Sequence, residues 1–322
     1  MSFFNHVLSD FTRFDRGGDG RISVKDLLPL LQERRLARHD AALAGTLRWL
    51  LPRRGPGWGR DELHRFEDER QRGYGDAPSW NTSFEEARQY LDHPERNSDL
   101  VRTDDASQWW HDVHQGRQND CWFVSALIGL ARHRPEEVRR LVAPSGEGRY
   151  DVTFPGHPTV RGVHVTDAEL ACYRPYAFLR DGLLLPVLEK AYGTLLNRHS
   201  SAPMEEVDHP TPRPGKSVRL LTGHGSRIYY LTRGPLGWWR QVLARRIHDA
   251  VAAGPQRLMT VSNTDFRRGH VFSVVSCTAG GEAITLKDPY AADVLQSLTL
   301  DELIRQFTFL IVESRGNDGG FF

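Results

Sequence analysis

The chain has 322 residues, a formal net charge of +1 and three cysteines, so it is long enough for about two domains and too poor in cysteine for a disulfide framework. A net charge near zero gives no general attraction to nucleic acid or to an anionic membrane surface. With a mean hydropathy of -0.51 and no apolar run near the roughly 18 residues of a spanning helix, no membrane insertion is predicted.

The beginning of the chain and its charged stretches indicate where the protein acts. Residues 1–7 lack the basic start and the long apolar core of a signal peptide, so a cytoplasmic location is expected, with export by a dedicated secretion route left open. The arginine-rich stretches 34–38 and 240–246 are interrupted by apolar residues, which is typical of solvated helix faces, so no nucleic-acid binding is predicted. The sequence carries no information on the oligomeric state.

The first acidic turn of the chain lies between two runs of helical periodicity, 3–14 and 27–38. It resembles an EF-hand calcium loop, in which Asp15, Asp19 and Asp26 would supply the oxygens of positions 1, 5 and 12. Position 3 has no side-chain oxygen, and position 12 is an aspartate where a bidentate glutamate is usual. Weak calcium binding is therefore expected.

A second loop with the same spacing follows between helical runs at 39–51 and 63–72. Here Trp58, Gly59 and Glu62 fall where Ile22, Ser23 and Asp26 fall in the first loop. The early ligand positions hold Leu, Arg and Gly, so this loop is expected to hold no calcium. Residues 1–72 are predicted to form an all-α, EF-hand-like lobe, with a plain helical hairpin carrying an acidic turn as the alternative.

The remainder of the chain divides by its periodicity. Residues 73–103 are predicted to be a linker around a short helix at 83–91. Residues 104–234 are mainly helical, with helices at 121–134, 136–142 and 184–197, strands at 150–154 and 159–165, and a surface loop at 203–215. Residues 235–322 are mainly β, with strands at 257–262, 271–277, 283–287 and 308–313 and helices at 238–253 and 300–307. The predicted fold class is α+β, two subdomains preceded by the small helical lobe.

Cys121 stands at the start of an apolar helix, directly after two good N-cap residues, Asn119 and Asp120. In the first turn the helix dipole and the unpaired backbone N–H groups favour a thiolate. Six residues upstream, Gln115 offers an amide that can fold back beside the sulfur. Cys172 and Cys277 lie in contexts typical of small core residues.

A thiol nucleophile needs a base and a group that orients the base. His270 enters an apolar strand after a glycine, and Asp288 ends the next strand-like run. Two adjacent strands would bring these residues side by side, so that the carboxylate fixes the tautomer of the imidazole. The separation of roughly 150 residues between Cys121 and His270 is typical of papain-like enzymes.

Four ordered motifs resemble the catalytic core of the calpains over about residues 100–315. They are Gln115-Gly-x-x-x-Asp120-Cys121-Trp122, Leu188-Glu189-Lys190-Ala191-Tyr192, Leu221-Thr222-Gly223 and Gly269-His270-x-x-Ser273-Val274. Asp288-Pro289-Tyr290 falls at the family's Asn-Pro-Trp. The resemblance implies a papain-like fold with Cys121 as nucleophile, His270 as base, and Gln115 with the Cys121 backbone N–H as the oxyanion hole. Asp288 takes the place of the family's Asn, which orients the imidazole, and Tyr290 takes the place of the Trp that shields the contact between His and Asn.

The resemblance also implies one calcium site in the core. Asp112 and Glu189 match its two carboxylate ligands, and the backbone carbonyls of Asp105 and Ser107 match its carbonyl ligands. Hard oxygen ligands suit calcium. The alternative is that the two acids are merely exposed. The family's second core site is not expected, because the segment after Tyr290 is short and Asp293 is its only acid.

These features predict a calcium-dependent, calpain-type cysteine endopeptidase that cleaves protein substrates. Two alternatives remain from other classes. A Cys-His-Asp set also suits acyl transfer to amines, as in transglutaminase-like enzymes, and a non-catalytic binding module could keep the fold. Loss of a triad residue would mark the binding module, and the sequence has lost none.

Overall fold

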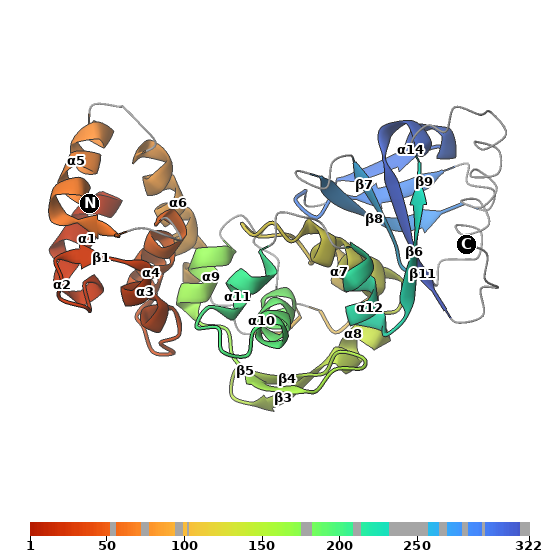
Figure 1. Ribbon diagram of the computed structural model, residues 1–322, viewed down its shortest axis with the longest axis horizontal. Helices are drawn as coiled ribbons and strands as arrows, with labels where there is room; N and C mark the ends of the chain where they lie inside the picture. The colour runs from red at the N-terminus through yellow and green to blue at the C-terminus, as the bar shows by residue number, and fades with distance from the viewer. Residues whose placement is uncertain are drawn as a thin grey trace.

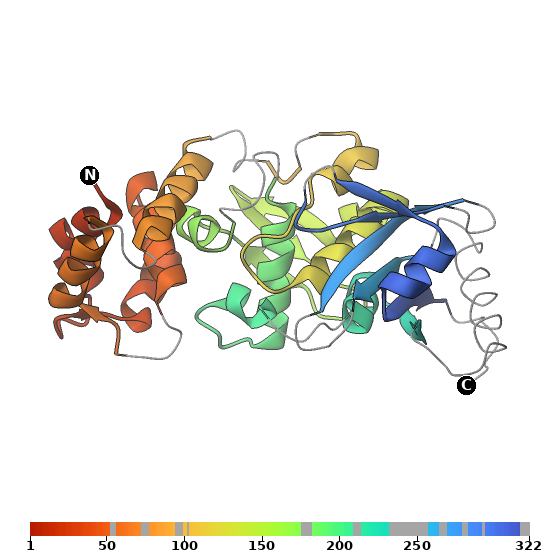
Figure 2. The ribbon, with the colours of Figure 1, turned by 90° about the horizontal axis from the view of Figure 1, so that it is seen from above.

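The structure is a computed structural model that describes residues 1–51, 56–71, 77–93, 99–101, 103–174, 182–208, 214–231, 257–263, 269–278, 283–291 and 294–315. Three parts follow one another along the long axis: the N-terminal helices in red and orange, a central helical part, and an antiparallel sheet in blue (Figure 1). Seen from above, the same order holds (Figure 2). The α+β class predicted from the sequence is confirmed, with helices and strands segregated along the chain. None of the described helices is both long and apolar enough to cross a membrane.

The N-terminal lobe consists of helices joined by a short β-ladder. Its elements are α1 (Phe3–Ser9), α2 (Phe11–Phe14), β1 (Arg21–Ile22), α3 (Val24–Leu31), α4 (Arg38–Leu50), β2 (Trp58–Gly59), α5 (Arg60–Gln71) and α6 (Ala77–Asp92). In the ladder Ile22 lies opposite Trp58, the register expected from aligning the two loops. Helix α3 ends seven residues before the predicted end at 38, and the four residues that follow it, Gln32 to Arg35, are polar and exposed.

Helix α6 extends further than the short helix predicted at 83–91. It packs against α4, and its side chains Phe84, Ala87 and Leu91 are buried at helical spacing. The region 73–103, predicted to be a linker, therefore contains a helix that belongs by its packing to the N-terminal lobe. The periodicity of this segment had indicated a helix, but not that its apolar face meets α4.

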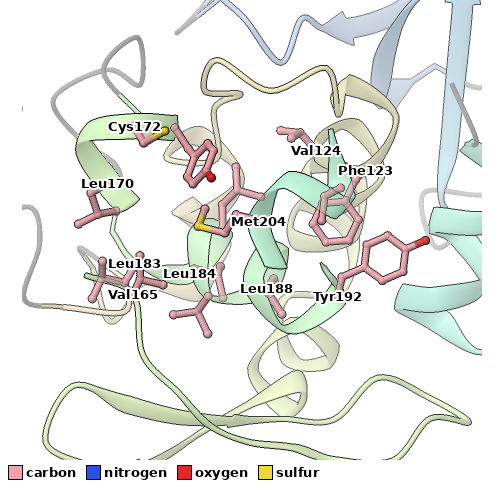
Figure 3. Packing of buried hydrophobic residues seen from close by; sticks show 14 of the residues in the cluster. Phe123, Val124, Val165, Leu170, Cys172, Leu183, Leu184, Leu188, Tyr192 and Met204 are labelled. Atoms are coloured by element: carbon pink, nitrogen blue, oxygen red, sulfur yellow. The ribbon is translucent and has the colours of Figure 1, made fainter. Parts of the chain in front are cut away.

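The central part, which we call the Cys unit, carries the cysteine helix. Its elements are η2 (Ala106–His111), α7 (Cys121–His133), α8 (Pro135–Leu141), β3 (Val142–Gly146), β4 (Arg149–Val152), β5 (Val160–Val163), α9 (Asp167–Tyr173), α10 (Leu184–Leu196), α11 (Pro203–Val207) and α12 (Pro214–Thr222). Every residue of α7 from Cys121 to Ala131 is buried, as expected for a helix that is apolar on all sides. Phe123 of α7 stacks on Tyr192 of α10 with ring centroids 5.6 Å apart, in the core drawn in Figure 3.

Two helices of the Cys unit were not predicted. Helix α9 begins with a capping box in which Thr166 and Glu169 satisfy each other's backbone N–H groups, a signature present in the sequence. Helix α11 lies within the predicted surface loop 203–215. Both helices line the side of the Cys unit that faces the N-terminal lobe, so they position the elements described below.

The third part, which we call the sheet unit, contains six described strands in the order β10-β9-β8-β7-β11-β6, all antiparallel. They are β6 (Gly225–Tyr230), β7 (Met259–Asn263), β8 (His270–Cys277), β9 (Ile284–Lys287), β10 (Leu295–Leu298) and β11 (Phe309–Ser314), with α14 (Leu300–Gln306) packed beside β10. The helix predicted at 238–253 lies outside the described residues. Strand β8 packs on α7, so the sheet meets the cysteine helix directly.

The N-terminal lobe and the Cys unit share one hydrophobic core. Helix α4 crosses α9 so closely that a side chain at Gly45 would lie 2.6 Å from the Cβ of Ala171. Arg48, which is buried, forms an ion pair with Glu205 of α11. The apolar cluster that contains the lobe's phenylalanines also contains the core of α7 and α10, whereas most of the sheet unit's core forms a separate cluster.

A buried carboxylate joins the Cys unit to the far side of the sheet unit. Glu313 of β11 is fully buried and accepts hydrogen bonds from Arg134 Nη2 at 2.7 Å and from the backbone N–H of Leu258 at 3.0 Å. The Nδ1 atom of His224 lies 2.5 Å from its other oxygen. Burial alone would raise the pKa of Glu313, but the bonds from His224 and Leu258 and the charge of Arg134 lower it overall.

Candidate active site

The loop before α7 places Cys121 at the first position of the helix. The backbone carbonyl of Asp120 accepts the first helical bonds, from Phe123 at 2.7 Å and Val124 at 3.1 Å. The helix therefore begins where the sequence predicted. The Asp120 side chain makes no capping bond; it is fully buried on the side of Glu189 and Arg174 instead.

The thiol of Cys121 is buried and lies against the strand that carries the predicted base. Its Sγ is 3.9 Å from the backbone carbonyl of Gly269, the residue before His270. Burial raises the pKa of the Cys121 thiol to about 12. Nearby backbone hydrogen bonds act in the opposite direction, but their effect on the pKa is smaller. The thiolate expected from the helix dipole is therefore outweighed by desolvation in this conformation, and the sulfur is a neutral thiol at pH 7.

This raised pKa predicts how the thiol reacts. Without calcium, the rate at which iodoacetamide alkylates Cys121 should keep rising with pH beyond pH 9, because only the thiolate reacts and its fraction grows towards a pKa of about 12. Stopped-flow or mass-spectrometric alkylation between pH 6 and pH 10.5 measures this. A plateau near pH 7 would show that a thiolate is already formed and would contradict the prediction. Cys277, which is half-buried, serves as the internal reference in the same spectra.

His270 and Asp288 come together as the sequence predicted. They lie at the same end of two adjacent antiparallel strands, His270 as the first residue of β8 and Asp288 just after β9. The Nε2 atom of His270 is 2.6 Å from Oδ1 of Asp288. Burial alone would raise the pKa of Asp288, but the bond to His270 and the backbone N–H of Tyr290 lower it overall, so the carboxylate stays ionised.

Two aromatic rings enclose the imidazole of His270. Tyr290 stacks on it with ring centroids 5.2 Å apart, and Phe272 meets it edge-on at 4.7 Å. The shielding role expected for Tyr290 is therefore compatible with its position. Rings on two sides restrict the imidazole and keep water from the bond between His270 and Asp288.

Gln115 lies beside the nucleophile loop, as predicted, but its amide points inward. The side chain is buried, and its Nε2 donates to the carbonyl of Gln118 and to the hydroxyl of Tyr290, the latter at 3.1 Å. Its backbone N–H donates to the carbonyl of Pro289 at 2.8 Å. Two contacts thus join the loop to the turn that follows Asp288, so the nucleophile and the base are held by one set of bonds.

The loop is also braced from the N-terminal lobe through Arg117, a residue that the sequence did not single out. Its side chain is fully buried, with the guanidinium 5.4 Å from the centroid of the Trp49 ring and 3.6 Å from Glu86 Oε2. The preceding Gly116 lies so close to the carbonyl of Tyr173 that a side chain there would clash at 2.1 Å. No local pattern marked this residue, because Glu86 and Trp49 lie far from it in the sequence.

The predicted core calcium ligands lie in different surroundings. Glu189 is fully buried, 3.8 Å from Arg174 Nη1, and its charge together with burial raises the pKa of Asp120 well above the usual range. Asp112 ends η2 and is half-buried. The carboxylate of Asp105 caps the same turn by accepting from the N–H of Ser107 at 3.0 Å.

The acidic loop of the N-terminal lobe is closed by its own hydrogen bonds. Asp15 accepts from the N–H groups of Asp19 and Gly20, at 3.2 and 2.9 Å. Asp26 accepts from Gly17 at 2.7 Å and from Ser23. In the part of the chain that the structure describes, no three His, Cys, Asp or Glu side chains lie together as a metal site.

The arrangement as a whole suits nucleophilic catalysis. A cysteine at a helix start and an imidazole hydrogen-bonded to a carboxylate are components of a thiol hydrolase. The model of the calpain family of cysteine proteases matches residues 88–292, well over half of the chain. Among curated proteins, none matches. This chain therefore belongs to the calpain family and is a cysteine-type peptidase, a hydrolase that acts on protein substrates.

Proposed function

We propose that the protein is a calcium-dependent endopeptidase in which Cys121, His270 and Asp288 form the catalytic triad. The observation that carries the proposal is the 2.6 Å bond between His270 and Asp288, formed at the start of β8, where the carbonyl of Gly269 lies 3.9 Å from the Cys121 sulfur. Because Nε2 is engaged with the carboxylate, Nδ1 is the nitrogen that can take the thiol proton.

The reaction follows from these roles. Nδ1 of His270 takes the proton from Cys121, and the sulfur adds to the carbonyl carbon of the scissile peptide bond. When the C–N bond breaks, the leaving amine takes that proton from His270, and a thioester to Cys121 remains. Water then adds to the thioester with His270 as base, which releases the acid and restores the thiol. Asp288 keeps the imidazole in the required tautomer and stabilises the imidazolium.

The first step requires the sulfur to leave its present surroundings. Burial is the largest cause of the raised pKa of Cys121. Desolvation of this size would oppose ionisation unless an imidazolium formed beside the sulfur. We therefore take the described arrangement to be a resting form, from which the Cys unit and the sheet unit shift to bring His270 Nδ1 to Cys121 Sγ.

Calcium is proposed as the ligand that favours this shift. The donors are all hard oxygens, as calcium requires: Asp112 and Glu189 with the carbonyls of Asp105 and Ser107 in the core, and Asp15, Asp19 and Asp26 in the lobe. The buried carboxylate of Glu189, next to a second acid and only 3.8 Å from a guanidinium, fits a site that also takes an inorganic cation. The ion would supply positive charge that orders the loop 105–121.

Casein cleavage by the full chain tests the proposal. We expect cleavage to be lost in Cys121→Ala and in chelator, and to return as calcium is added. Asp112→Asn and Glu189→Gln should raise the calcium concentration that gives half the activity, whereas Asp19→Asn reports on the lobe loop separately. Glu136→Gln, an exposed acid of α8, is the matched control.

Isothermal titration with calcium accompanies each variant, so that binding is measured apart from catalysis. Unchanged cleavage by Cys121→Ala would overturn the triad. Full activity in chelator, with no calcium binding by titration, would overturn calcium dependence while leaving the peptidase assignment in place.

A further inference from the structure

A cavity lies between helix α4 of the N-terminal lobe and the Cys unit, on the side where α9 and α11 face the lobe (Figure 1). Its volume is about 380 Å³, and it is half open to solvent. The described residues that line it come from both parts of the chain: Arg48, Trp49, Leu51, Asn119, Cys172, Tyr173, Glu205 and Asp208. None of them belongs to the sheet unit, so a shift of that unit would leave these walls in place.

One wall of the cavity is continuous with the loop that leads to the nucleophile. Asp208 accepts from the backbone N–H and from the side-chain amide of Asn119, both at 3.0 Å. Asn119 stands two residues before Cys121, so their Cα atoms are at most about 7 Å apart. Because an extended peptide advances roughly 3.4 Å per residue, a peptide held at Cys121 can place a nearby side chain in the cavity.

The lining suits a cation on an apolar stem. It holds two carboxylates and one guanidinium, so negative charge is in excess. The guanidinium of Arg48 is already paired with Oε1 of Glu205, to which the hydroxyl of Tyr173 also donates at 3.0 Å. No described group donates to Oε2 of the same carboxylate. The rings of Trp49 and Tyr173 and the side chain of Leu51 form apolar walls, and aromatic rings also attract cations.

The polar lining is incomplete without an occupant. Only 4% of Arg48 is exposed, and its Nε–H has no acceptor among the described residues. A buried donor is costly to leave unpaired, and a carbonyl oxygen beside it would satisfy it. A peptide carries a carbonyl at every residue. A peptide with a basic side chain therefore offers both a cation for the carboxylates and an acceptor for the guanidinium.

We propose that this cavity is a specificity pocket that binds a lysine or arginine side chain of the protein substrate, within about three residues of the scissile bond. Glu205 and Asp208 bind the cationic head, and the apolar walls enclose the stem. The N-terminal lobe is thus part of the substrate site, since it contributes Arg48 and Trp49. This inference rests on the proposed function, in which the peptide is held against Cys121.

The test uses pairs of internally quenched peptides that differ only in arginine or citrulline at one position, scanned along both sides of the scissile bond. Citrulline keeps the length and shape of arginine but carries no charge. With the wild-type full chain at saturating calcium, we expect kcat/KM to be on the order of tenfold higher for the arginine peptide at one position. At the other positions the two peptides should be cleaved equally well.

Two variants remove the charge of the pocket while keeping its hydrogen-bond acceptors. In Asp208→Asn the amide oxygen can still accept from Asn119, and the ratio of kcat/KM for arginine over citrulline should fall to about twofold or less. Glu205→Gln should lower the ratio in the same way. Glu206→Gln is the matched control, because it changes the neighbouring acid of α11, which binds Asn197 and lies outside the described lining. Its ratio should equal that of the wild type.

Binding measured apart from catalysis gives a second readout. Cys121→Ala should bind the arginine peptide on the order of tenfold more tightly than the citrulline peptide in fluorescence anisotropy. Asp208→Asn in this background should remove most of the difference. The thermal midpoint of each variant is measured alongside, so that a misfolded variant is recognised and the other one decides.

Equal kcat/KM for arginine and citrulline at every position would overturn the inference. A preference for arginine that survives in both Asp208→Asn and Glu205→Gln would also overturn it, because the side chain would then be bound elsewhere. If cleavage by the wild type depends on Cys121, these results remove the pocket and leave the proposed function in place. If no such cleavage occurs, the proposed function fails, and the substrate pocket fails with it.

Discussion

Replacement of His270 by alanine is expected to lower kcat for peptide hydrolysis by roughly 10⁴- to 10⁶-fold, the order found when the base of a catalytic triad is removed. In the proposed mechanism the imidazole accepts the Cys121 proton and donates it to the leaving amine, so its loss would stop both halves of the reaction. Cleavage of a fluorogenic peptide at saturating calcium measures the effect. His157→Ala, at an exposed turn, is the control.

The same assay shows whether Cys121 and His270 act as one catalytic unit or contribute to the rate independently. The double variant of Cys121→Ala with His270→Ala should be no less active than either single variant, because the residues act as a unit. Asp288→Asn should cost far less than Asp288→Ala, since an amide oxygen can still accept from His270 Nε2. Multiplicative losses in the double variant would contradict a shared mechanism.

Glu313→Gln is expected to lower the free energy of unfolding by about 3–5 kcal/mol, the range for breaking a buried ion pair from one side. The glutamine keeps the shape of the side chain but removes the buried charge that faces Arg134, which keeps the more exposed Glu137 at 3.2 Å. Denaturant unfolding followed by tryptophan fluorescence measures the change. Glu136→Gln, which affects an exposed pair with Arg139, should stay within about 0.5 kcal/mol.

This carboxylate also predicts the direction of the response to pH. Its pKa is lower in the folded chain than the ordinary value of 4.5, so its contribution is fully present above pH 4.5 and is lost as the pH falls through the lowered pKa. The wild type should therefore lose stability relative to Glu313→Gln as the pH is taken below 4.5. A difference that stays constant from pH 7 to pH 3 would contradict this assignment.

The positions of the three residues proposed as the triad could be predicted because each has a local signal in the sequence. Cys121 directly precedes an apolar helix, and the chain there does begin α7. His270 and Asp288 bound two short apolar runs that alternate as strands, and antiparallel pairing of neighbouring runs is the usual outcome. Local sequence patterns were therefore enough to predict that the imidazole and the carboxylate lie at the same end of the sheet.

The remaining features of the site depend on contacts between distant parts of the chain. The bond from Gln115 to Tyr290 spans 175 residues, and the bond from Arg134 to Glu313 spans 179. Neither pair has a spacing that periodicity can reveal. The raised pKa of Cys121 arises mainly from burial, which depends on the packing of the sheet on α7. The sequence shows only that the thiol stands at a helix start, and that position by itself predicts a lowered pKa.

The shared core of the N-terminal lobe and the Cys unit has a thermodynamic consequence. Helix α4 packs closely on α9 at Gly45, and Arg117 contacts both Trp49 and Glu86 of the lobe. We therefore expect the lobe and the nucleophile loop to unfold as one cooperative unit. A ligand that binds only the folded lobe would then stabilise that whole unit by its own binding free energy. If the loop Asp15–Asp26 bound such a ligand, its occupancy and the order of Gln115–Cys121 would be linked equilibria, and no hinge or sliding element would be needed between them.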